Sequence, residues 1–156
     1  MDEALPQDLL GRLTAGETIS AEEVAFTAGG FDGAAIGLVW DTFARDRVTA
    51  HVVCGPEHHQ PYGIVHGGVW CSIVETVASI AGALRVAGEG RLTVGVSNTT
   101  DFLRSHREGR VDAVGTPIHV GRLQQLWQVE LTRASDGKAV ARGQVRLQNV
   151  DPAQLS

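Results

Sequence analysis

The chain has 156 residues, of which 43% are hydrophobic and 20% are charged, as expected for one soluble globular domain with its own core. The net charge of −5 excludes nucleic acid as the main partner, because phosphate backbones require a basic surface; a local group of arginines could still bind a small polyanion. The acidic N-terminus does not have the charge pattern of a signal peptide, and Cys54 and Cys71 fit neither a metal-binding nor a disulfide pattern. We therefore expect a cytoplasmic protein that has no metal and does not bind a membrane.

Residues 1–32 are predicted to form an N-terminal helical extension. Ser20 followed by Glu22 and Glu23 is typical of a helix start, and Gly29-Gly30 is expected to end that helix. The sequence assigns no role to this extension.

The rest of the chain contains several runs in which apolar residues alternate with a period of two. The first begins at Ala35, surrounds a turn at Arg45-Asp46 and predicts a β-hairpin. The later runs cover residues 92–103, 111–120, 126–134 and 139–147, the last two joined by the hairpin signal Ser135-Asp136-Gly137-Lys138. These runs predict five or six mostly antiparallel strands in a domain spanning residues 33–150, with residues 151–156 as a C-terminal tail.

One stretch, residues 67–84, is apolar or small on every side and predicts a single long buried helix. Its many small residues would let it lie close inside a curved sheet. The predicted fold class is therefore α+β, a hotdog fold in which the sheet wraps the helix. The stretch is also about long enough to span a membrane, but the charge at its middle, Glu75, argues against that alternative.

Glu75 is the one charged residue of this helix, and no Lys or Arg lies within a turn of it. A carboxylate in apolar surroundings must be paired, neutralised or functional. Two interpretations remain open at this point: Glu75 is a reactive group, or it pairs with an arginine from a distant strand.

The residues around the start of the helix could supply the other parts of an acyl-transfer site. Gly67 and Gly68 would expose backbone N–H groups at the positive end of the helix, where an oxyanion can be stabilised. Gln60 offers an amide donor, and His66 could orient the loop or add a donor. Ser79 lies on the same helix face as Glu75 and could hold a water. Taken singly, each residue also has an ordinary structural explanation.

Gly67 and Glu75 are eight residues apart, which corresponds to about 12 Å along one helix. One substrate carbonyl cannot contact both groups, because each contact requires about 3 Å. A site that uses both must take one from each of two chains related by a two-fold axis. We therefore expect at least a homodimer.

The sequence resembles the hotdog-fold acyl-CoA thioesterases of the phenylacetate-pathway type over roughly residues 33–149. This family includes the 1,4-dihydroxy-2-naphthoyl-CoA hydrolases, the enterobactin proofreading thioesterase and the 4-hydroxybenzoyl-CoA thioesterases that use a catalytic Glu. The matching segments are residues 59–68 (HQPYGIVHGG), Glu75-Thr76, Ser79, residues 117–122 (PIHVGR) and Arg104.

The resemblance implies that Glu75 acts as nucleophile or general base on a thioester. Gln60 and the Gly67 N–H would polarise its carbonyl, His66 would support their loop, and Ser79 would place the water. It also implies that Glu75 and Ser79 face the other three residues from a neighbouring subunit, in a dimer or a dimer of dimers.

Coenzyme A would enter only as part of the substrate, and no separate cofactor is expected. Its phosphates require cations, and Arg104 and Arg122 are preferred over Arg107 and Arg110 because they lie in matching segments. Gly68 and His119 are further candidate substrate contacts, although His119 is more simply explained as shaping its strand.

Three functions remain to be separated. The leading one is hydrolysis of an acyl-CoA or acyl-carrier-protein thioester with an aromatic or medium-chain acyl group. The second is a non-catalytic acyl-CoA-binding or regulatory domain, which would not need Glu75. A hydratase or dehydratase typically pairs Asp with His, and the spacing from His66-Gly67-Gly68 to Glu75 does not fit that chemistry.

Overall fold

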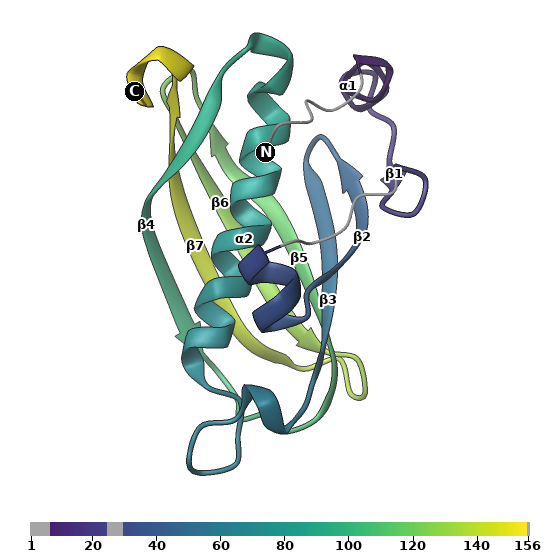
Figure 1. Ribbon diagram of the computed structural model, residues 1–156, viewed down its shortest axis with the longest axis vertical. Helices are drawn as coiled ribbons and strands as arrows, with labels where there is room; N and C mark the ends of the chain where they lie inside the picture. Colours follow the sequence, from purple (N-terminus) through teal and green to yellow (C-terminus); the bar gives the residue numbers. More distant parts are fainter. Residues whose placement is uncertain (1–6, 25–29, 156) are drawn as a thin grey trace.

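The computed structural model describes residues 7–24 and 30–155 and shows one long helix lying in a curved antiparallel sheet (Figure 1). The sheet has seven strands in the order β1-β2-β3-β5-β6-β7-β4. The strands are β1 (Ile19–Ser20), β2 (Val39–Ala44), β3 (Arg47–Cys54), β4 (Leu92–Phe102), β5 (Gly109–Val120), β6 (Gln124–Arg133) and β7 (Ala139–Val150). The helices are α1 (Gln7–Thr14) and α2 (Gly67–Val86), and the short turns are η1 (Phe31–Ile36), η2 (Pro56–His58), η3 (Ala87–Glu89) and η4 (Pro152–Leu155). The predicted α+β hotdog fold is confirmed, with seven strands instead of five or six.

The additional strand, β1, forms where a helix start was predicted. Ile19 and Ser20 pair with Phe43 and Thr42 of β2. Ser20 Oγ does accept a hydrogen bond from the Glu22 N–H at 3.2 Å, as a helix cap would, but a turn follows instead of a helix. Ile19 and Ala21 are 1% and 4% exposed, so burial of these two side chains overrides the local cap signal. Gly29 lies outside the described residues.

A second difference concerns the start of the first hairpin. The alternating pattern from Ala35 predicts a strand, but residues 31–36 form the π-helical turn η1, and β2 begins at Val39. Gly37 ends this turn in the left-handed conformation at φ 69°. The Thr76 hydroxyl of α2 donates to Asp32 Oδ1 at 2.6 Å, which holds η1 against the central helix.

Helix α2 forms the core with the concave face of the sheet. Its most buried residues are Ile73, Val74, Val77 and Ala78, each 0% exposed. They pack against the inward side chains of the sheet, which include Val48, Val52, Val111, Val129, Leu131, Val145 and Leu147. Gly82 lies directly against Leu147, so the small residues do bring helix and sheet close together.

The composition of α2 predicts a helix that is buried on every face, but one face is only half-buried. Ser72, Glu75, Thr76 and Ser79 are half-buried and follow the three- and four-residue spacing of one helix face. Residues 67–89 are long and apolar enough to cross a membrane, with a mean hydropathy of 1.4, but the sheet wraps them (Figure 1). They form a core helix.

A buried polar network lies near the C-terminal end of α2. The Gln125 amide, 0% exposed, donates from Nε2 to the Gly82 carbonyl at 3.1 Å and to Asn149 Oδ1 at 2.7 Å. Its Oε1 accepts a hydrogen bond from the Trp127 indole at 2.8 Å. The network ties β6 and β7 to the helix.

Candidate active site

His66 caps the N-terminus of α2 and determines which amide remains open there. Its Nδ1 accepts a hydrogen bond from the Gly68 N–H at 2.8 Å, and its carbonyl accepts one from the Val69 N–H at 3.0 Å. Gly67 is the first residue of the helix, so its N–H has no intrahelical acceptor. Among the described residues, no hydrogen bond engages this N–H, which therefore remains available to an oxyanion.

The loop before the helix, residues 55–66, is held from both sides. His58 is 5% exposed; its Nε2 bonds to the Ile36 carbonyl at 2.8 Å and its Nδ1 accepts from the Gly55 N–H at 3.1 Å. His59 Nε2 bonds to the Arg107 carbonyl at 2.8 Å, and Arg107 Nη1 donates to the Gly63 carbonyl at 2.6 Å. These contacts fix the backbone that carries Gln60.

Most of the predicted carbonyl-binding and loop residues lie around one open pocket of about 510 Å³. The predicted residues in its lining are Gln60, His66, Gly67, Gly68 and Arg104, and the apolar part of the wall includes Ile64, Trp70, Phe102 and Leu103. The structure therefore brings together the unbonded Gly67 N–H, the Gln60 side-chain amide and the Arg104 guanidinium.

Glu75 lies elsewhere on α2, together with Ser79. The Ser79 hydroxyl is 3.5 Å from Glu75 Oε1, and the Asn98 amide donates to Oε2 at 3.0 Å. In residues 7–24 and 30–155, no ion pair joins a cation to Glu75, so the alternative of a pairing arginine is not realised there. Glu75 is absent from the described lining of the pocket at Gly67, in agreement with the separation predicted from the sequence.

Arg122 and His119 line a second open depression of about 450 Å³, with Gly121, Leu123, Gln124 and Gln148. Gln148 pairs with Val94 near the start of β4, whereas Phe102 at the end of β4 lines the first pocket. Eight residues of strand, at about 3.3 Å each, separate the two positions by about 26 Å. One chain therefore does not bring Arg104 and Arg122 together.

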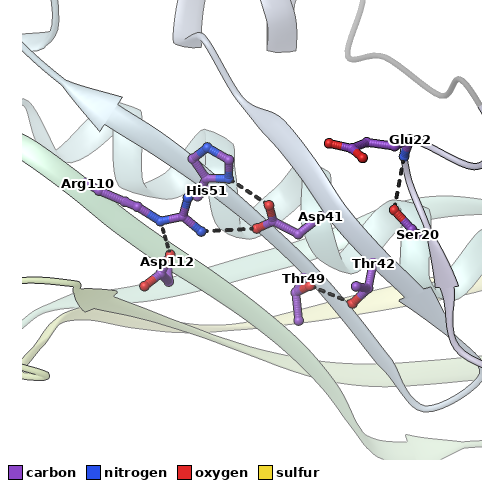
Figure 2. Close-up of polar contacts among 8 residues, drawn as sticks. All are labelled: Ser20, Glu22, Asp41, Thr42, Thr49, His51, Arg110 and Asp112. Carbon is purple, nitrogen blue, oxygen red and sulfur yellow. Dashed lines mark hydrogen bonds and ion pairs between the residues drawn. The ribbon is translucent and has the colours of Figure 1, made fainter.

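The other two candidate arginines are engaged in structural contacts. Arg107 holds the loop at Gly63, as described above. Arg110 pairs with Asp112 at 2.6 Å and with Asp41 at 3.6 Å, and Asp41 also bonds to His51 at 2.9 Å (Figure 2). Arg104 Nη1 also donates to a backbone carbonyl, that of Ala139, at 2.7 Å. These contacts therefore do not separate Arg104 from Arg107, and the preference for Arg104 and Arg122 stays a prediction from the matching segments.

The aromatic candidates for an acyl pocket separate into two groups. Trp70 and Phe102 line the pocket at Gly67. Trp127 is fully buried in the core network, and Tyr62 is 81% exposed on the loop.

The sequence did not identify two residues that contact Glu75, Asn98 and Gly95. Both lie on β4, where an ideal Cβ placed on Gly95 would be 2.5 Å from Glu75 Oε1. Their one sequence signal is a glycine and an asparagine within an otherwise alternating strand, two residue types that strands disfavour.

Comparison with known proteins defines the class to which this fold and site belong. Residues 62–140 match the family model of the thioesterase superfamily. The chain belongs to this superfamily of thioester hydrolases.

Three relatives illustrate the similarity. The structure of AziG from S. sahachiroi is 41% identical, with a TM-score of 0.74 over 79% of this chain and 98% of that one. Thioesterase HI1161 of Haemophilus influenzae is 31% identical, with a TM-score of 0.71 over 76% of this chain and 82% of that one. The 1,4-dihydroxy-2-naphthoyl-CoA hydrolase of Escherichia coli is 42% identical over 96 residues, which are 62% of this chain and 70% of the relative.

Proposed function

We propose that this protein hydrolyses an acyl-CoA or acyl-carrier-protein thioester, with Glu75 as nucleophile or general base. The observation that carries the proposal is a carboxylate held by neutral donors, on a helix whose first amide is open at a pocket. An aromatic acyl group is the first choice and a medium-chain group the second. The E. coli relative, named as a hydrolase of an aromatic acyl-CoA, supports this order.

The chemistry requires only groups from the chain and water. The Gly67 N–H and the Gln60 amide donate to the thioester oxygen and stabilise the charge that develops there. Glu75 either attacks the carbonyl carbon, releasing the CoA thiolate and leaving an anhydride that water opens, or accepts a proton from the attacking water. The Ser79 hydroxyl positions that water in both routes. No separate cofactor or metal is required, and the proposed setting is the cytoplasm.

A complete site requires a second copy of the chain. Strand β4 is at the edge of the sheet, paired on one side with β7, and it exposes Leu92, Val96 and Phe102 by 43%, 51% and 57%. The unpaired backbone groups of a long edge strand are a template for pairing. Antiparallel pairing of two β4 strands about a two-fold axis would place the start of α2 in one copy beside the middle of α2 in the other.

The same pairing would combine the two cation sites. The start of one β4 would lie beside the end of the other, so Arg122 and His119 of one copy would approach Arg104 and Gly68 of its partner. Coenzyme A would then be bound by residues from both chains. A dimer of dimers would leave this unit intact.

The test is an assay of free thiol release with benzoyl-, hydroxybenzoyl-, phenylacetyl- and straight-chain acyl-CoAs, comparing the wild type with Glu75→Gln. We expect turnover of an aromatic thioester that Glu75→Gln abolishes while substrate binding remains. Binding without turnover in the wild type would instead support a regulatory acyl-CoA-binding domain. Full activity in Glu75→Gln would overturn the proposed mechanism.

Subunit mixing tests whether each site is shared. Glu75→Gln and Gln60→Ala are each expected to be nearly inactive as homodimers. After a one-to-one exchange, half of the dimers are mixed and each regains one intact site, so about a quarter of the wild-type activity should return. No recovery, despite mass-spectrometric proof of subunit exchange, would place Glu75 and Gln60 in one chain's site.

A further inference from the structure

The Glu75 carboxylate is held unequally at its two oxygens. Oε2 accepts a hydrogen bond from Asn98 Nδ2 at 3.0 Å, within the normal range for N–H···O bonds. Oε1 is 3.5 Å from the Ser79 hydroxyl, at the outer limit for a hydrogen bond. One oxygen is therefore anchored, and the other is only weakly engaged.

The orientation of the Asn98 amide is fixed by its other partners. Nδ2 also donates to the Cys71 carbonyl at 3.1 Å, and Oδ1 accepts from the Thr100 hydroxyl at 2.7 Å. A flipped amide would place Oδ1 against a carbonyl and a carboxylate, both of which are acceptors. The N–H face of Asn98 is therefore directed at Glu75.

Gly95, three residues before Asn98 on β4, leaves the space that Oε1 occupies. An ideal Cβ at position 95 would lie 2.5 Å from Oε1 and 3.6 Å from the Glu75 carboxyl carbon. Apart from its two chain neighbours, the described residues place no other atom within 4 Å of that Cβ, and Gly95 does not have a left-handed φ. An alanine there could be accommodated by displacing only the end of the Glu75 side chain.

We propose that Asn98 and Gly95 are positioning residues for the reaction: Asn98 anchors Oε2 of Glu75, and Gly95 keeps Oε1 free as the reactive oxygen. Oε1 is then the atom that attacks the thioester or accepts the proton of water. This inference rests on the proposed role of Glu75 and deepens it.

No cation of the described residues forms an ion pair with Glu75. The titratable residues with contacts beside Glu75 are Asp32 of η1, which bonds to Thr76, and Cys71 of α2 itself, whose carbonyl accepts from Asn98. Asp101 pairs in register with Arg142, whose side chain is exposed on the opposite face of the sheet.

Three variants test the two roles. Asn98→Ala removes the anchor, and kcat is expected to fall about ten- to a hundredfold, the range for a lost hydrogen bond to a charged group. Asn98→Asp places a second carboxylate beside Glu75, so the acid limb of kcat/KM should move upward by about one pH unit or more. Gly95→Ala should lower kcat with little change in KM or melting temperature. Ser97→Ala, on the other face of β4, is the control and should match the wild type.

A double-mutant cycle separates positioning from general damage. The side chain in Glu75→Asp is one methylene shorter than glutamate. Its carboxylate should therefore not reach the methyl group introduced by Gly95→Ala. The kcat loss caused by Gly95→Ala should therefore shrink in a Glu75→Asp background. Equal losses in both backgrounds would refute the role of Gly95.

A readout independent of substrate comes from carboxyl carbon NMR of protein labelled at glutamate, with the Glu75 signal assigned by its loss in Glu75→Gln. In Asn98→Asp this signal should titrate at a higher pH than in the wild type, and in Ser97→Ala it should be unchanged. An unmoved titration together with unchanged kinetics would overturn the proposal while leaving Glu75 catalytic. Full activity of Glu75→Gln would instead remove the proposed function.

Discussion

The aromatic ring of Phe102, at the end of β4, lies directly against the backbone of Gly67 at the start of α2. A Cβ atom built on Gly67 would come within 2.7 Å of two ring carbons, closer than real side-chain contacts allow. The glycine thus has a packing reason to be there in addition to its open amide. Phe102 and Gly67 both line the pocket at the start of α2.

Gly67→Ala should destabilise the protein by about 1 kcal/mol or less, because the new methyl group meets the end of the Phe102 ring, which is exposed and can shift, and because alanine favours the helix. Phe102 is 57% exposed, so its truncation relieves the clash. In Phe102→Ala protein, adding Gly67→Ala should therefore cost much less stability. Urea denaturation of the four proteins measures the difference, and identical costs in both backgrounds would contradict the contact.

His66→Ala should lower stability by about 1 kcal/mol, because the Gly68 N–H loses its cap. Asparagine is a good cap residue, so His66→Asn should restore most of the loss. Chemical denaturation compares the three proteins. A stability in His66→Asn equal to that of His66→Ala would show that capping is not the role of this side chain.

Gln125→Leu should cost about 3 kcal/mol, since it leaves the buried Trp127 N–H and Asn149 Oδ1 without the partners described above. The neighbouring Gln124 is exposed and bonds to Gln148, so Gln124→Leu is the matched control and should change stability little. Equal effects of the two substitutions on the urea midpoint would contradict the importance of the buried network.

Cys54 should be inert to thiol reagents in the folded protein. Burial, aided by the negative charge of Glu57, raises the pKa of the Cys54 thiol from 9.0 to about 12, and the thiolate is the reactive form. In Cys71→Ser protein at pH 8, a chromogenic disulfide reagent should label Cys54 only after unfolding by urea. Rapid labelling of the native protein would show that the site opens readily.

The raised pKa of the Cys54 thiol also determines the direction in which stability changes with pH. The unfolded chain releases the Cys54 proton near pH 9 and the folded chain near pH 12. This contribution is therefore fully present below about pH 9 and is lost as the pH rises toward 12. Between these pH values, the free energy of unfolding should fall more steeply in the wild type than in Cys54→Ala.

The alternating patterns predicted six of the seven strands. In five of these strands one face packs on the core, whereas the edge strand β4 has no buried residue. Helix α2 was predictable because its apolar residues pack on the core. Its composition did not indicate that the face carrying Glu75 is only half-buried. Strand β1 could not be predicted, because the signal at Ser20 is local, whereas burial of Ile19 and Ala21 depends on the whole fold. The proposed domain limits at residues 32 and 150 stay a prediction.

The candidate site was predictable where it follows from one segment. Gln60, His66, Gly67 and Gly68 lie within nine residues of sequence, and the structure gathers them at one pocket. Asn98 was not predictable, since a register shift between Gly95 and Ser97 interrupts the period of two and brings Gly95 and Asn98, three residues apart, to the same helix residue. That contact depends on the alignment of β4 against α2, which no local sequence pattern specifies.

Strand β4 is fourth along the chain but last in the sheet, and its neighbour there is the final strand, β7. During synthesis on the ribosome, β4 has no strand to join until residues 139–150 have emerged. The groups that orient Glu75 therefore come into place only near the end of folding. Under the proposed mechanism, a stalled or truncated polypeptide that ends before Ala139 would carry Glu75 without its Asn98 partner and should not hydrolyse thioesters.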